Sequence, residues 1–139
     1  MIRVIDASVA SKWFIAEPQT DIAEALLLRG DVLVAPDLIV AEICNVAWLK
    51  CRRGDISDQQ AVAMIEGLPA MFDELVPVTE LASRALVIAS ETDHPAYGCF
   101  YIALAERHGT QVVTADRRLL ARLATTRWAA FLVGLGDAG

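Results

Sequence analysis

The sequence predicts an α/β fold, a single domain with a parallel central sheet of four to five short strands flanked by helices. Short apolar runs alternate with helical segments along the whole chain. These runs are apolar throughout, which is typical of parallel strands buried on both faces. A length of 139 residues suits one domain, and no repeat or linker divides it. We assign the domain to residues 1–133 and a C-terminal tail to residues 134–139.

The first half of the chain contains two predicted strands and four predicted helices. In order they are strand 2–6, helix 8–15, helix 19–29, strand 32–35, helix 37–53 and helix 57–66. Apolar residues three and four apart predict helix 19–29, and Gly30 ends it. Pro36 suits the start of the long helix, and Gly54 its end. Ser57, with Gln60 three residues later, forms a capping-box pattern.

The second half repeats the alternation with three strands and three helices. In order they are strand 75–78, helix 79–90, helix 95–108, strand 112–114, helix 116–124 and strand 128–132. Thr79 and Asp116 suit the N-caps of two of these helices. Pro95 lies near the start of the helix at 95–108, and Gly109 follows its end.

Three acidic residues stand where apolar residues are expected. Asp6 ends the first strand, Asp116 follows the strand at 112–114, and Glu42 lies within the apolar arc of the long helix. Ligand sites in parallel α/β folds lie beyond the carboxyl ends of strands, where both aspartates fall. Carboxylates gathered there suit a hard divalent ion such as Mg²⁺ or Mn²⁺.

Polar neighbours of these carboxylates are candidates to orient them or a bound water. Thr114 and Ser8 each lie two residues from a strand-end aspartate, and Asn45 lies on the flank of the helix face that carries Glu42. Structural explanations compete with each assignment. The two aspartates and Ser8 also suit ordinary helix capping, and Glu42 suits pairing with an arginine.

Composition narrows the class of protein and its surroundings. Hydrophobic residues make up 55% of the chain, a surplus that suits contact with a partner or a second copy. A net charge of -6 argues against a passive nucleic-acid binder but not against a metal-dependent nuclease. Three cysteines without a CxxC pair, no signal peptide and no apolar run of membrane-spanning character predict a cytoplasmic protein. His94 and His108 are interpreted as surface residues.

Four segments resemble the motifs of the PIN domains, specifically the VapC toxins, in the order and at the distances usual in that family. They are VIDASV at residues 4–9 with Lys12 and Trp13 after it, AEICN at 41–45, YGCFYIALA at 97–105 and VTADRR at 113–118. The resemblance implies a PIN-like ribonuclease domain and RNA cleavage that depends on Mg²⁺ or Mn²⁺. It also implies a cognate antitoxin, and a homodimer or a toxin–antitoxin hetero-oligomer. Asp6, Glu42 and Asp116 then match three of the family's four acidic residues as metal ligands and catalytic groups.

The chain departs from the family at Gly98, where an aspartate usually follows the residue that matches Tyr97. One fewer negative charge weakens cation affinity. Glycine inside a helix also costs about 1 kcal/mol relative to alanine. We interpret Gly98 as a loss-of-function change, either acquired during production or a natural decay of activity.

Three functions remain open from the sequence. The first is a metal-dependent endoribonuclease that acts as the toxin of a toxin–antitoxin pair and is impaired by Gly98. The second is a catalytically inactive PIN-like module that binds antitoxin or RNA without cleavage. The third, a phosphatase-like or response-regulator-like protein that uses Asp6, is disfavoured because no further acidic residue stands beside it.

Overall fold

A five-stranded, wholly parallel sheet forms the centre of the computed structural model, which describes all 139 residues. The strands are β1 (Ile2–Ile5), β2 (Val32–Pro36), β3 (Glu74–Val76), β4 (Val112–Thr114) and β5 (Leu132–Gly134). Their spatial order is β3-β2-β1-β4-β5. In register, Val4 pairs with Val34 on β2 and Ile5 pairs with Val113 on β4. The predicted parallel α/β sheet is confirmed.

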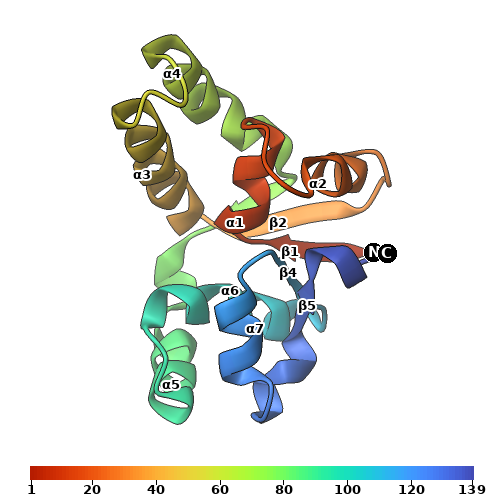
Figure 1. Cartoon of the computed structure of the whole chain (residues 1–139). Coiled ribbons are helices and arrows are strands. Elements are labelled where there is room, and N and C mark those ends of the chain that lie inside the picture. The colour runs from red at the N-terminus through yellow and green to blue at the C-terminus, as the bar shows by residue number, and fades with distance from the viewer.

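Seven α-helices cover the two faces of this sheet. They are α1 (Ala7–Ala10), α2 (Thr20–Leu27), α3 (Leu38–Arg52), α4 (Asp58–Gly67), α5 (Ala82–Thr92), α6 (Ala96–His108) and α7 (Arg117–Leu123). Figure 1 shows α1 to α4 on one side of the sheet and α5 to α7 on the other, with the two termini close together. None of the helices has the length and apolar character needed to cross a bilayer.

The core lies between the sheet and the helices on either face. Helix α6 buries six side chains between Cys99 and Ala105, because it packs across the sheet. Ile5 on β1 and Ile43 on α3 are fully buried as well. Each large apolar side chain removed from water contributes about 1.5–3 kcal/mol, so this packing holds the strand ends in fixed positions.

Most element boundaries agree with the sequence, and the capping box of Ser57 and Gln60 is present. The strand predicted at residues 128–132 is wrong. Residues Arg127–Phe131 form a 3₁₀ turn, and the strand is Leu132–Gly134. Thr126 caps the turn by accepting from the Trp128 N–H, and the buried Trp128 indole donates to Glu91 at 2.6 Å.

Three further local predictions differ from the structure. Thr79 lies in a 3₁₀ turn and does not cap α5, which begins at Ala82. The helix predicted at residues 8–15 ends at Ala10 and continues as a 3₁₀ turn. In the segment predicted as a tail, Leu135 and Ala138 are buried in the core.

Candidate active site

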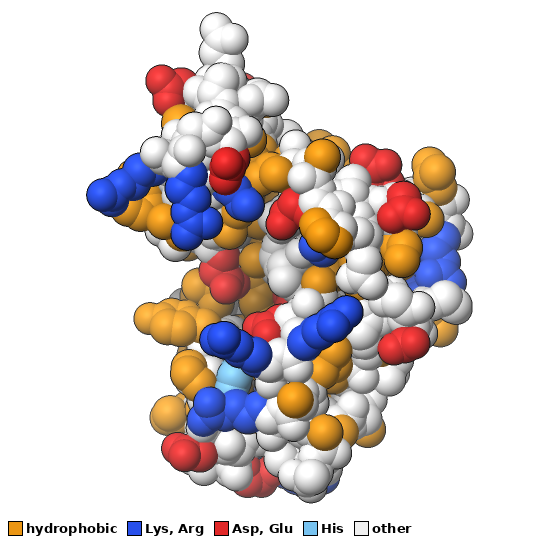
Figure 2. Space-filling model, viewed as in Figure 1, with side chains coloured by type: hydrophobic (Ala, Val, Ile, Leu, Met, Phe, Trp, Pro, Cys, Tyr) orange, Lys and Arg blue, Asp and Glu red, His pale blue; other side chains and the backbone are white.

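A pocket of about 280 Å³ opens at the carboxyl ends of the central strands. Strand β2, which follows β1 along the chain, lies on one side of β1, and β4 lies on the other side. The position between β1 and β4 is therefore the switch point of the sheet, where the strand order reverses. Figure 2 shows a hollow with acidic side chains inside it and Lys and Arg side chains on both rims. Its polar lining comes from Asp6, Ser8, Glu42, His94, Tyr97, Tyr101 and Asp116.

Asp6 is held by a dense set of hydrogen bonds at the end of β1. Its Oδ1 accepts from the Ser8 hydroxyl at 2.6 Å and from the Val9 N–H at 3.2 Å. Its Oδ2 accepts from the Thr114 hydroxyl on the neighbouring strand. Asp6 is thus the N-cap of α1 and also a wall of the pocket, so both interpretations of this residue hold together.

The pKa of Asp6 is raised well above that of an ordinary aspartate. The residue is only 8% exposed. Burial raises the pKa of Asp6 from an ordinary 3.8 to about 6, against the hydrogen bonds from Ser8, Thr114 and Val9, which lower it. A nearby Glu42 adds a smaller increase. A carboxyl group with a raised pKa in a pocket is a common mark of a functional site, and a bound cation would remove the cost of ionising it.

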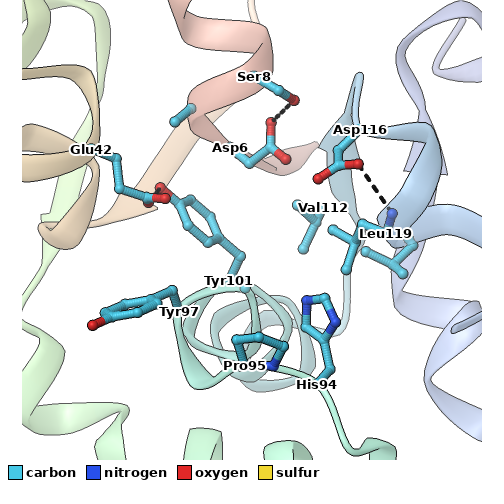
Figure 3. Close-up of a pocket in the computed structure, with 13 residues that line it drawn as sticks. Asp6, Ser8, Glu42, His94, Pro95, Tyr97, Tyr101, Val112, Asp116 and Leu119 are labelled. Carbon is cyan, nitrogen blue, oxygen red and sulfur yellow. Dashed lines mark hydrogen bonds between the residues drawn. The ribbon is translucent and has the colours of Figure 1, made fainter. Parts of the chain in front are cut away.

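Asp116 opens α7 at the end of β4 and faces the same pocket. Its Oδ1 accepts from the N–H groups of Arg118 and Leu119 at 3.0 and 3.1 Å. The other carboxylate oxygen points into the pocket toward Asp6 (Figure 3). Helix capping thus uses one oxygen of Asp116 and leaves the second for a ligand.

Glu42 reaches the pocket from α3 and is paired with a tyrosine rather than an arginine. The Tyr101 hydroxyl donates to Glu42 Oε1 at 2.6 Å. Figure 3 shows the Tyr101 side chain directed at Glu42. Burial raises the pKa of Glu42, and the Tyr101 hydrogen bond opposes this increase. Burial, together with the charge of Glu42, raises the pKa of Tyr101. Tyr101 therefore acts as a permanent donor that fixes the direction of the Glu42 carboxylate.

The three polar neighbours proposed from the sequence have different positions. Ser8 and Thr114 both donate to Asp6, and they also accept from the N–H groups of Ala115 and Asp116. They tie the ends of β1 and β4 together. Asn45 is exposed and lines an adjacent groove beside Glu42, outside the pocket that contains Asp6.

The structure overturns the interpretation of His94 and His108 as surface residues, because both are partly buried. His94 is partly buried and lines the pocket, with its ring directed toward the two aspartates (Figure 3). Its Nδ1 is buried without a hydrogen-bond partner. Burial lowers the pKa of His94, and the charge of Arg122 acts in the same direction. No sequence pattern indicated this position, because His94 lies in a loop before α6.

The donors suit a divalent ion bound mainly through two carboxylates. No three His, Cys, Asp or Glu side chains converge closely enough to enclose an ion by themselves. Mg²⁺ and similar ions, however, are usually held by one or two carboxylates, with water and substrate phosphate supplying the rest. Asp6 and Asp116 meet this requirement, and Glu42 lines the same pocket as a further carboxylate.

Comparisons with known proteins agree with this architecture. The PIN domain family model matches residues 3–125. Ribonuclease VapC3 of Pyrobaculum aerophilum is 31% identical over 121 residues, which cover 86% of this chain and 92% of that protein. Ribonuclease VapC1 of Mycobacterium tuberculosis is 30% identical over 105 residues, which cover 71% and 77% of the two chains.

Solved structures show the same fold. PAE2754 from Pyrobaculum aerophilum superposes with a TM-score of 0.68 at 21% identity, over 98% of this chain and 85% of that one. FitAcB from Neisseria gonorrhoeae superposes with a TM-score of 0.59 at 19% identity, over 96% of each chain. Fold and pocket together define a parallel α/β domain with carboxylates at its switch point. The chain belongs to the PIN-domain family, and the sequence relatives named above are VapC ribonucleases.

Proposed function

We propose that this protein is an endoribonuclease that depends on Mg²⁺ or Mn²⁺ and acts in the cytoplasm as the toxin of a toxin–antitoxin pair. One observation carries the proposal: Asp6 and Asp116, from distant parts of the chain, face a single pocket at the switch point of a PIN fold. The relatives named ribonucleases support the reaction class. Three free thiols suit a reducing compartment.

Asp6 and Asp116 are the residues that would hold the ion, and Glu42 would bind it directly or through water. When bound, a divalent ion supplies a water of lowered pKa and stabilises charge on the phosphate. Ser8 and Thr114 keep the Asp6 carboxylate fixed, and Tyr101 does the same for Glu42. Preorganised carboxylates of this kind reduce the reorganisation needed during the reaction.

RNA would reach the pocket along its basic rim. Arg117 and Arg118 follow Asp116 directly, are exposed, and form no ion pair within the protein. Arg52 and Arg53 lie exposed at the end of α3. These guanidinium groups suit phosphate contacts that offset the acidity of the chain as a whole.

The antitoxin, or a second copy of the chain, would bind the apolar groove between α3 and α4. Trp48 and Val62 are 53% and 55% exposed there, and Cys44 and Ile65 extend the same surface. Exposed apolar surface of this extent on a small domain favours a protein partner. An arginine or lysine from the antitoxin would fit the acidic pocket and block the cation position.

Gly98 supports a second candidate, a PIN module that binds antitoxin or RNA without cleavage. The test is Mg²⁺-dependent and Mn²⁺-dependent cleavage of single-stranded RNA by the wild-type chain and by Gly98→Asp, with Asp6→Asn as the inactive control. Cleavage by the wild-type chain, increased in Gly98→Asp, supports an impaired enzyme. Cleavage only in Gly98→Asp identifies a toxin that Gly98 has made inactive, and cleavage in neither protein contradicts the enzyme.

A further inference from the structure

We propose that His94 takes the place of the carboxylate that is absent at position 98, giving a pocket with mixed nitrogen and oxygen ligands that prefers Mn²⁺ to Mg²⁺. The inference rests on the proposed function, because it concerns the same cation. It concerns a residue outside the acidic set, four positions before the glycine. In this proposal an imidazole nitrogen replaces the carboxylate that is absent at position 98, so the cation does not lose a ligand.

The first observation is the lack of space for a side chain at position 98. A Cβ atom built on Gly98 would lie 3.0 Å from His94 Nε2 and 3.4 Å from His94 Cδ2. Real Cβ atoms are rarely found so close to another heavy atom, so a side chain at 98 requires the imidazole to move. The His94 ring therefore lies where a side chain from position 98 would begin.

The second observation is the position of the His94 imidazole in the pocket. His94 lines the pocket with Asp6 and Asp116, and its ring is directed toward both (Figure 3). Its Nε2, the ring nitrogen beside Gly98, forms no hydrogen bond, whereas Nδ1 is buried on the opposite edge of the ring. Imidazole nitrogen is a common ligand of transition metals, so a nitrogen without a hydrogen bond beside two pocket carboxylates is a candidate ligand.

The type of donor sets the preference among ions. Mg²⁺ strongly favours oxygen ligands, whereas imidazole nitrogen suits transition metals, and affinity rises from Mn²⁺ along the series. Because the metal-free side chains do not converge, His94 must move toward the aspartates when an ion enters. His94 lies in the short loop between α5 and α6.

The experiment measures metal binding directly, without relying on RNA cleavage. Calorimetry on the full chain gives the Mn²⁺ and Mg²⁺ affinities, and pulsed EPR on the Mn²⁺ complex detects coupling to a ligand nitrogen. The chain has two histidines, so His108→Ala at the far end of α6 is the matched control. His94→Ala tests the ligand, and His94→Gln guards against a folding failure because it keeps a polar side chain of similar length.

We expect nitrogen coupling in the wild type and in His108→Ala but in neither His94 variant. Both His94 variants should lose about tenfold or more in Mn²⁺ affinity and keep their Mg²⁺ affinity. The double change His94→Ala with Gly98→Asp, which removes the clash and restores the carboxylate, should raise Mg²⁺ affinity and abolish the Mn²⁺ preference.

The outcomes separate this inference from the function on which it rests. The role of His94 is overturned if Mn²⁺ binding needs Asp6 but shows no nitrogen coupling. It is also overturned if Mn²⁺ binding is unchanged in both His94 variants. Either result leaves the metal-dependent site intact. If the wild type binds neither ion, or Asp6→Asn binds them equally well, the proposed function and this inference fail together.

Discussion

Replacing Asp6 with asparagine should stabilise the metal-free protein at neutral pH. Ionised Asp6 is buried, and its pKa rises from 3.8 to about 6. At 1.36 kcal/mol for each pKa unit, this difference corresponds to about 3 kcal/mol of stability lost when the group ionises. Asparagine keeps the Oδ1 acceptor for Ser8 and Val9 but not the carboxylate oxygen that accepts from Thr114. Subtracting about 1 kcal/mol for that hydrogen bond leaves a net gain of about 2 kcal/mol.

The direction of the pH dependence follows from the raised pKa. The folded state binds the Asp6 proton more tightly than the unfolded state does, so the full contribution to stability is present below about pH 4. It is lost as the pH rises through about 6. Asp6→Asn does not titrate, and its advantage over the wild type should therefore appear between about pH 4 and pH 6 and remain constant above.

Urea unfolding with EDTA at pH 4.5 and pH 7.5 measures this difference. Asp116→Asn is the matched control, because that carboxylate is exposed and asparagine also caps helices well. Added Mn²⁺ should then stabilise the wild type and leave Asp6→Asn unchanged. The reasoning is refuted if Asp6→Asn gains no stability relative to the wild type between the two pH values.

Three further predictions follow from the same structure. Tyr101→Phe removes the donor to half-buried Glu42 and should lower stability at neutral pH by about 1–2 kcal/mol, as measured by urea unfolding; an unchanged midpoint would contradict the role of this hydrogen bond. Replacing Arg117 and Arg118 together with alanine should weaken RNA binding and lower the salt-dependence slope by about 1 for each residue, in fluorescence titrations at several salt concentrations; an unchanged slope would exclude them as phosphate contacts. Trp128→Ala should cost about 3–5 kcal/mol in thermal or urea unfolding, because its side chain is fully buried; a loss below about 1 kcal/mol would contradict its place in the core.

The sheet and two carboxylates of the site were predictable because their signals are local. An apolar run followed by an aspartate identifies a strand end, and parallel topology brings such ends to one edge. Asp6 and Asp116 could be placed together on this argument, and the structure puts both in one pocket. The strand near Trp128 was placed too early, because a buried tryptophan in a 3₁₀ turn has the same apolar pattern as a strand.

Contacts between residues far apart in the chain could not be predicted from the sequence pattern. The partner of Glu42 is Tyr101, 59 positions away, and the two side chains meet only because the fold brings α3 and α6 to the same pocket. His94 precedes a proline in a loop, so no helical or strand period gives its direction. Its proximity to Gly98 depends on how the loop enters α6, which is a tertiary property.

The central claim is that the pocket around Asp6 and Asp116 cleaves RNA with the help of a divalent ion. The most direct measurement is the rate of cleavage of single-stranded RNA by purified wild-type chain in Mn²⁺, in Mg²⁺ and after EDTA, beside Asp6→Asn and Asp116→Asn. The account predicts cleavage that needs the ion, is faster in Mn²⁺ than in Mg²⁺, and disappears in both variants. Cleavage that survives EDTA or either substitution, or its absence from the wild type under every condition, would contradict it.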